Sequence, residues 1–133
     1  MKELDKYISL AGKNIVITGA GQGIGLAVAK LFVKYGGRVA MIDHSGRSFQ
    51  EAEKIGENAI AFKCDISDET QVKKTVSDIL EEFKTIDILV NNAGLALGME
   101  PAHKASIEDW EDMIDTNNKG LVYMTRAVLP GMV

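Results

Sequence analysis

The segment NIVITGAGQGIG, residues 14–25, decides the fold of this chain of 133 residues. Residues 14–18 lack the polar alternation of a half-exposed strand, which predicts a strand buried on both faces, as in the centre of a parallel sheet. Glycines at positions 19, 21, 23 and 25 follow it directly. From Gly23 to about Tyr35 the apolar residues recur at helical spacing, and Gly36-Gly37 end the pattern. The segment therefore predicts a strand, a tight glycine turn and a helix in direct succession.

The same rhythm continues along the chain. Further strands are predicted at 38–43, 58–64 and 86–90. Ser48-Phe49-Gln50-Glu51 and Asp68-Glu69-Thr70-Gln71 have the spacing of capping boxes, which predicts a helix after the second strand and another after the third. Ser106 is predicted to cap a last helix that runs almost to the end of the chain, over 106–132.

Each predicted helix has a stripe of apolar residues. The stripes consist of Ile24, Val28, Leu31 and Phe32 in the first helix, Val72, Val76, Ile79, Leu80 and Phe83 in the third, and Ile107, Trp110, Met113 and Ile114 in the last. Strands that alternate with helices indicate an α/β fold, with a parallel four-stranded sheet of Rossmann type in the order 3-2-1-4 and helices on both faces. A ligand crevice is then expected beyond the carboxyl ends of the first and fourth strands.

Composition limits the function classes. The length fits one domain over 1–133, and a net charge of −4 without a basic stripe argues against nucleic acid or an anionic membrane as a partner. A single cysteine, Cys64, forms no internal disulfide and favours a reducing, cytoplasmic setting. Neither a metal-ligand pattern nor an apolar run of membrane-spanning length is present, so a small organic ligand is expected.

The glycine turn and Asp43 together predict the ligand. Backbone amides at a glycine turn before a helix can hold a pyrophosphate, although glycines also serve turns for steric reasons alone. Asp43 ends the second strand, 24 residues after Gly19, where a carboxylate binds the ribose hydroxyls of NAD and repels the 2′-phosphate of NADP. The uncharged Gln22 also favours NAD. Asp43 could instead be a solvated residue at a strand end.

The motifs resemble those of the short-chain dehydrogenases/reductases over essentially the whole chain. Thr18-Gly19-x-x-x-Gly23-Ile24-Gly25 is similar to the cofactor motif of that family, and Asn91-Asn92-Ala93-Gly94 to its second signature. By this resemblance Asp65 would contact the adenine, and Asn117 would support a proton-relay water in catalysis. The resulting cofactor-binding set is Gly19, Gly21, Gln22, Gly23, Ile24, Gly25, Asp43, Asp65, Ile66, Asn91, Ala93 and Gly94.

Local structure offers a second interpretation of these polar residues. Asn91 and Asn92 could end a strand, Asp65 could cap a turn, and Asn117 could bond the backbone and kink its helix. His103 and Cys64 receive no role. The family's catalytic Tyr-x-x-x-Lys has no counterpart in these 133 residues, because Ala11, Val39 and Ala127 stand four residues after the three tyrosines.

Three functions remain open at this point. The chain could be the NAD-binding half of such an enzyme, truncated and without turnover alone. It could be an oxidoreductase of hydroxy or carbonyl compounds, completed by a further segment, or an artificial half-fold that binds nothing. Residues 86–133 resemble the family's bacterial NADP-dependent 3-hydroxy acid (serine) dehydrogenase branch and residues 1–85 do not, which suggests a chimera. A bare apolar strand at 86–90 and the helix at 106–132 predict a homo-oligomer.

Overall fold

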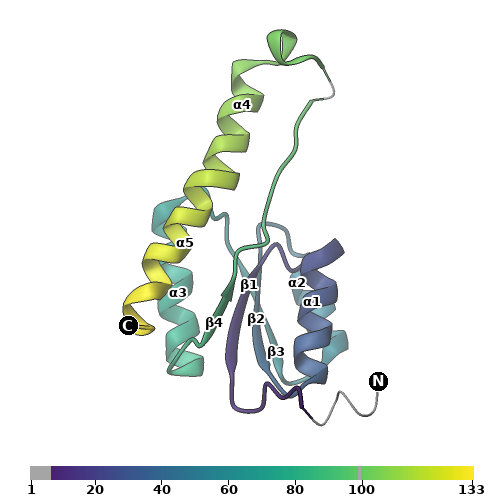
Figure 1. The fold of residues 1–133 in the computed structure, drawn as a ribbon, viewed down its shortest axis with the longest axis vertical. Coiled ribbons are helices and arrows are strands. Elements are labelled where there is room, and N and C mark those ends of the chain that lie inside the picture. Colours follow the sequence, from purple (N-terminus) through teal and green to yellow (C-terminus); the bar gives the residue numbers. More distant parts are fainter. Residues whose placement is uncertain (1–6, 99) are drawn as a thin grey trace.

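The computed structural model describes residues 7–98 and 100–133. Its centre is a parallel sheet of four strands, β1 (Asn14–Thr18), β2 (Arg38–Asp43), β3 (Ala59–Lys63) and β4 (Ile88–Val90). The strand order is β3-β2-β1-β4, which confirms the predicted topology (Figure 1). Two strands are shorter than predicted, since β3 omits Asn58 and Cys64, and β4 begins at Ile88 rather than Ile86.

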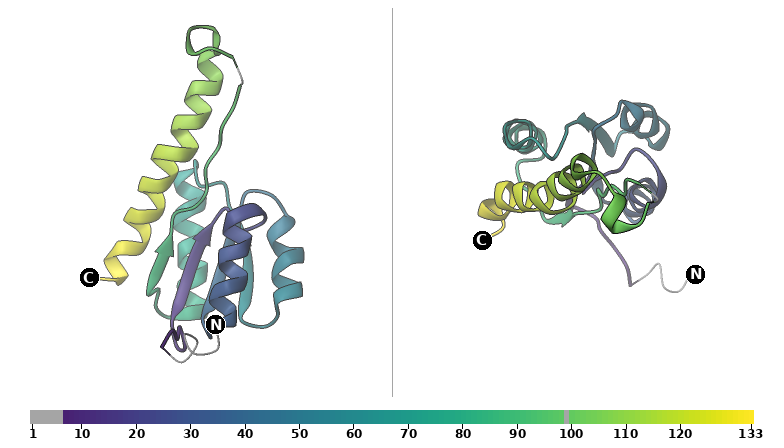
Figure 2. Two further views of the ribbon diagram at one scale, coloured as in Figure 1. Left: turned by 45° about the vertical axis from the view of Figure 1, so that its right-hand side comes forward. Right: turned by 90° about the horizontal axis from the view of Figure 1, so that it is seen from above.

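Helices cover both faces of the sheet, as predicted (Figures 1 and 2). Helices α1 (Gly23–Lys34) and α2 (Arg47–Ile55) pack on one face, and α3 (Glu69–Phe83) and α5 (Leu121–Val128) pack on the other. Strand β1 contributes to both cores, because Val16 lies in the core under α3 and Ile15 and Ile17 lie in the core under α1. This central position explains its uninterrupted apolar run.

The buried stripe of α1 matches the predicted one only in part, since Val28 and Phe32 pack against the core and the other two residues do not. Ile24 and Leu31 are 76% and 46% exposed, whereas the fully buried residues of the helix are Gly25 and Ala29. Small residues face the sheet because they allow the helix axis to approach the strands more closely than a leucine would. The end of α1 follows the prediction. Gly36, with φ of 95°, donates to Val33 O and the next glycine donates to Phe32 O, which is a Schellman motif.

Two of the three predicted helix caps are confirmed. The Asp68 carboxylate accepts hydrogen bonds from the N–H groups of Thr70 and Gln71, and Ser106 Oγ accepts from Asp109 N. The hydrogen bonds to Gln71 and Thr70 lower the pKa of the Asp68 carboxyl.

The third predicted cap, Ser48, is wrong. Helix α2 begins at Arg47 after Gly46, so Ser48 lies inside the helix and faces the sheet together with Ala52, one turn later. Its hydroxyl is buried and has no hydrogen-bond partner among the described residues.

The last helical segment is continuous but not uniform. It consists of α4 (Ile107–Ile114), a π-helical segment η3 (Asp115–Gly120), α5, and a final turn η4 (Leu129–Gly131), and a short turn η2 (Ala102–Lys104) precedes it. Helix α4 projects beyond the carboxyl ends of the strands (Figures 1 and 2) and contains no buried residue. Its predicted apolar side therefore faces outward, with Ile107, Trp110 and Ile114 between 42% and 71% exposed. No helix in residues 7–98 and 100–133 is long and apolar enough to span a membrane.

Candidate functional site

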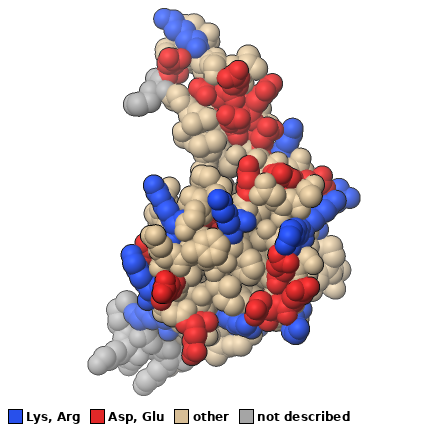
Figure 3. All heavy atoms as spheres, turned by 180° about the vertical axis from the view of Figure 1, so that it is seen from behind, with Lys and Arg blue, Asp and Glu red and all other residues tan. Residues whose placement is uncertain are grey.

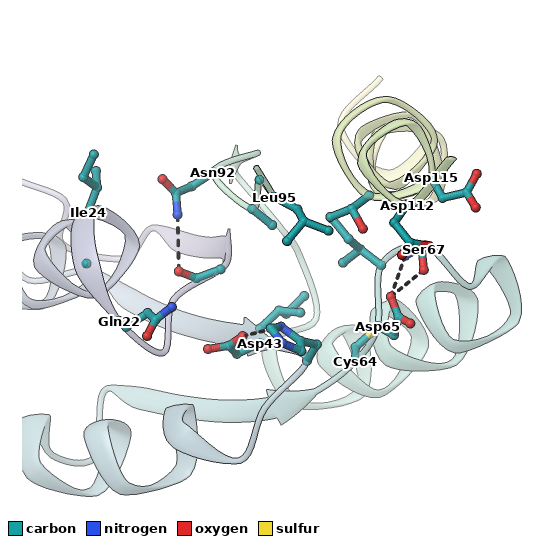
Figure 4. A pocket seen from close by; sticks show the side chains of 18 residues that line it. Gln22, Ile24, Asp43, Cys64, Asp65, Ser67, Asn92, Leu95, Asp112 and Asp115 are labelled. Atoms are coloured by element: carbon teal, nitrogen blue, oxygen red, sulfur yellow. Dashed lines mark hydrogen bonds and ion pairs between the residues drawn. The ribbon is translucent and has the colours of Figure 1, made fainter. Parts of the chain in front are cut away.

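A cavity of about 520 Å³ lies at the carboxyl ends of the strands, where the crevice was predicted (Figure 4). Its walls come from the glycine turn, the ends of β2 and β3, the loop after β4, and the α4–η3 helix. Predicted residues that line it are Gly19, Gln22, Gly23, Ile24, Asp43, Asp65, Ile66, Ala93 and Gly94. The remaining predicted residues do not line the cavity. They are Gly21, Gly25, Asn91 and Asn117.

The glycine turn places the start of α1 at this cavity. The turn is tied to β2 by a hydrogen bond from Ala20 N to Ile42 O of 3.0 Å. Gly19 and Gly23 have φ of 65° and 58°, the left-handed conformation that favours glycine. Helix α1 begins with no side-chain cap and no acidic residue in its first turn. The first-turn N–H groups and the positive end of the helix dipole are therefore suited to an anion.

Gly21 and Gly25 serve close packing instead. A Cβ atom on Gly21 would overlap Oδ2 of Asp43. A Cβ atom on Gly25 would overlap the carbonyl oxygen of Gly19 and lie 2.5 Å from Asn92 Nδ2. Because these two residues lack a Cβ atom, the turn can pack closely against β2 and against the loop after β4.

Asp43 lies at the cavity wall and is only 7% exposed. Its Oδ1 lies 3.2 Å from Nδ1 of the exposed His44, which also lines the cavity. A second contact nearby is not predictable from local pattern: the Arg47 guanidinium donates to Oε1 of Gln22. The positive charge of Arg47 therefore lies beside Gln22, whose lack of charge favours NAD in the sequence.

Thr18 and Asn92 join the glycine turn to the loop after β4. Thr18 Oγ1 accepts from the N–H groups of Asn92 and Ala93 at 3.1 and 3.0 Å and donates to Val90 O at 3.5 Å. Asn92 Nδ2 donates to the carbonyls of Thr18 and Gly19 at 3.1 and 3.3 Å. Neither residue was in the predicted site, although both belong to the motifs that defined it. Their polar side chains at the ends of adjacent apolar strands were the available signal.

Asn117 holds the same loop from the other side. Its Oδ1 accepts from Leu95 N at 2.7 Å, and its Nδ2 donates to Leu95 O at 2.8 Å. Asn117 lies within η3, so the predicted disturbance of the helix is present, but the side chain bonds a distant backbone instead of its own helix. Asn91 points away from the cavity, since its Nδ2 donates to Thr125 Oγ1 on α5 at 3.1 Å.

Carboxylates dominate the charge of the cavity wall. Asp43, Asp65, Asp112 and Asp115 line the cavity, and no lysine or arginine does so among the described residues. Asp65 also has the structural role considered above, because its Oδ1 accepts from the backbone N and the Oγ of Ser67 at 3.0 and 2.6 Å. Cys64 lies beside it, and burial raises the pKa of its thiol. The wall residues from α4 and η3 were not predicted, because helical spacing does not show that this helix extends over the crevice.

Comparisons with known proteins decide the family. Residues 13–133 match the family model of the short chain dehydrogenases. The chain belongs to the short-chain dehydrogenase family. The NADP-dependent 3-hydroxy acid dehydrogenase YdfG of Escherichia coli K12 is 50% identical over 120 residues, which cover 90% of this chain and 48% of that protein. The chain thus spans about half the length of the curated relatives it matches.

Solved structures of two similar proteins agree with this fold. A closed form of serine dehydrogenase complexed with NADP⁺ has a TM-score of 0.86 at 49% identity, covering 90% of this chain and 49% of that one. A 3-ketoacyl-(acyl-carrier-protein) reductase from Brucella melitensis complexed with NADH has a TM-score of 0.90 at 38% identity, covering 92% and 51%.

The hypothesis that the chain is a chimera of two family members gains no support from these matches. The alignment with the Escherichia coli relative covers 120 residues, far more than the segment 86–133 contains, so it extends well into residues 1–85. The chimera stays a prediction.

Proposed function

We propose that residues 1–133 form one dinucleotide-binding half-domain whose ligand is NAD(H). One observation carries the proposal: the uncapped start of α1 and the nearly buried carboxylate of Asp43 line the same cavity. Helix N-termini bind phosphate, and a carboxylate at the end of the second strand binds ribose hydroxyls. The two groups thus match adjacent parts of one dinucleotide. Membership in the short-chain dehydrogenase family supports this assignment.

The cavity offers a place for each part of the ligand. The backbone of Gly19 and Gly23 would face the pyrophosphate, with the exposed Ile24 providing an apolar contact beside it. Asp65 and Ile66, after β3, would contact the adenine. Ala93 and Gly94, held in place by Thr18 and Asn117, would border the nicotinamide half. When bound, NAD(H) supplies hydride chemistry, and the residues described here bind and orient it.

Charge favours NAD over NADP, although the relatives named above include NADP-dependent proteins. The 2′-phosphate of NADP would approach Asp43 in a cavity wall that holds three further carboxylates. Repulsion between like charges in a partly enclosed site costs more than in bulk water.

Asp43→Asn is expected to weaken NADH binding by roughly tenfold, because it exchanges a charge-assisted hydrogen bond to the ribose for a neutral one. Fluorescence of the reduced nicotinamide during titration measures the effect. Asp78→Asn is the matched control, since Asp78 pairs with Lys74 on the surface of α3 and should leave NADH affinity unchanged. Equal affinity of the Asp43 variant and the unaltered chain would contradict the role of Asp43.

A second candidate is an oxidoreductase of hydroxy or carbonyl compounds, favoured by the similarity to the 3-hydroxy acid dehydrogenase. The two functions differ in one requirement. Oxidation of an alcohol needs a group that accepts its proton, and these 133 residues contain no Tyr-x-x-x-Lys to do so. Asn117 would then support catalysis only beside a tyrosine and a lysine from elsewhere.

Self-association is also part of the proposal, through α4 rather than β4. Helix α4 is amphipathic, and its apolar residues Ile107, Trp110 and Ile114 are spaced three and four residues apart and remain between 42% and 71% exposed. The helix also carries four carboxylates, Glu108, Asp109, Glu111 and Asp112, and acidic side chains gather over the projecting end of the molecule in the view from behind (Figure 3). A second copy with the same apolar stripe fits this surface, because two such helices can pack while their acidic sides remain in water.

We expect a dimer at micromolar concentration in sedimentation velocity. The double variant Trp110→Gln and Ile114→Gln should sediment as a monomer, because it removes the centre of the apolar stripe. Phe49→Gln, which alters a similarly exposed apolar side chain on α2, is the control and should remain dimeric. A monomeric unaltered chain would contradict this part of the proposal.

A further inference from the structure

The α4–η3 helix forms a wall of the cavity to which no part of the ligand has been assigned. Its lining residues are Asp112, Asp115 and Thr116. They are three and four positions apart, a spacing that places side chains on one side of a helix. Figure 4 shows Asp112 and Asp115 at the same end of the cavity as Asp65, away from Gln22 of the glycine turn. This wall therefore borders the end at which the adenine would lie.

Two contacts fix this helix beside the segment after β3. Gly120, the last residue of η3, is buried, and a Cβ atom there would lie 2.7 Å from Cγ1 and Cδ1 of Ile66. Asn117 bonds the backbone N–H and carbonyl of Leu95, at 2.7 and 2.8 Å. A base that contacts Ile66 would therefore lie beside the lining residues of this helix.

The three carboxylates at this end of the cavity differ in the partners that they already have. Asp65 Oδ1 accepts from the backbone N and the Oγ of Ser67. Asp115 Oδ1 lies 3.1 Å from Nζ of Lys119, as an ion pair. The Asp112 carboxylate takes part in no hydrogen bond or ion pair within residues 7–98 and 100–133. Both of its oxygens can therefore accept hydrogen bonds from a ligand.

A carboxylate in this position favours one kind of base edge. It accepts hydrogen bonds but donates none, and carboxylates pair with the exocyclic amino groups of bases. Adenine has such an amino group at position 6. Hypoxanthine has a carbonyl oxygen there instead, and a hydrogen on N1. A carbonyl oxygen facing the carboxylate would set two acceptors against each other and leave the carboxylate without a partner, which is costly.

We infer that Asp112 selects the base of the dinucleotide by accepting a hydrogen bond from the 6-amino group of adenine, an inference that rests on the proposed function. Asp65 and Ile66 contact the base from the segment after β3, and Asp112 contacts its amino group from α4. The chain therefore binds dinucleotides of adenine more tightly than those of hypoxanthine.

The test uses NADH and the reduced form of nicotinamide hypoxanthine dinucleotide, which differ only at the base. Their dissociation constants are measured by nicotinamide fluorescence for the unaltered chain, for Asp112→Asn and for Asp109→Asn. The asparagine amide at position 112 can donate to the carbonyl oxygen of hypoxanthine, as the carboxylate cannot. Asp109 is the matched control, because it lies on the same helix but does not line the cavity.

The unaltered chain should bind NADH roughly tenfold more tightly than the hypoxanthine dinucleotide, and Asp112→Asn should remove most of this preference. Asp109→Asn should retain it. No preference in the unaltered chain, an unchanged preference in the Asp112 variant, or an equal loss in the Asp109 variant would overturn the inference while leaving NADH binding intact. If neither dinucleotide bound the unaltered chain, the proposed function would be overturned with it.

Discussion

Gly25→Ala is expected to lower the free energy of unfolding by about 3 kcal/mol. Gly25 is buried where α1 crosses the glycine turn, and an added Cβ would overlap the carbonyl oxygen of Gly19. The added atom would also lie 2.5 Å from Asn92 Nδ2, which donates to that same carbonyl. Backbone cannot yield as a flexible side chain does, so α1 must move away from β1.

Urea unfolding followed by circular dichroism measures this loss. Gly131→Ala is the control, because a Cβ at that position would meet nothing within 4 Å, and its stability should change by less than about 0.5 kcal/mol. Similar unfolding midpoints for the two variants would show that α1 does not approach the turn as closely as described.

Thr18→Val is expected to cost about 2 to 4 kcal/mol of stability and to weaken NADH binding as well. Valine has nearly the same shape as threonine but cannot accept the N–H groups of Asn92 and Ala93, which would then lack their partner. The loop after β4 borders the cavity, so its displacement affects the ligand as well as the fold.

Thr18→Ser separates the hydroxyl from the methyl group. The serine variant keeps the acceptor and should lose only about 1 kcal/mol, from the missing methyl group. Urea unfolding and NADH titration of both variants give the comparison. A serine variant as damaged as the valine variant would contradict the role of the Thr18 hydroxyl.

Features that depend on local pattern were predictable from the sequence. The alternation of strands and helices gave the strand order, and the polar residues Asp68 and Ser106 before apolar runs gave two caps, because capping bonds join residues two or three positions apart. Most of the predicted cofactor residues line one cavity, since parallel strands bring their carboxyl ends together.

Features that depend on close packing or distant partners were not predictable in this way. Apolar spacing placed Ile24 and Leu31 on the buried side of α1, because a hydrophobic pattern gives no weight to Gly25 and Ala29, which the sheet requires for close approach. Ser48 resembled a cap in spacing but faces the sheet.

Distant side-chain bonds were missed for the same reason. The bonds of Asn117 to Leu95 join residues 22 positions apart, and the bond of Arg47 to Gln22 joins residues 25 positions apart. No local pattern indicates such pairs, because the two residues of each pair meet only in the folded chain.

Binding of NADH and NADPH to the unaltered chain near neutral pH tests the central claim most directly. If the start of α1 and Asp43 bind one ligand, titration followed by nicotinamide fluorescence should show saturable binding. NADH should then bind more tightly than NADPH. Absence of saturable binding at millimolar cofactor, or tighter binding of NADPH, would contradict the account.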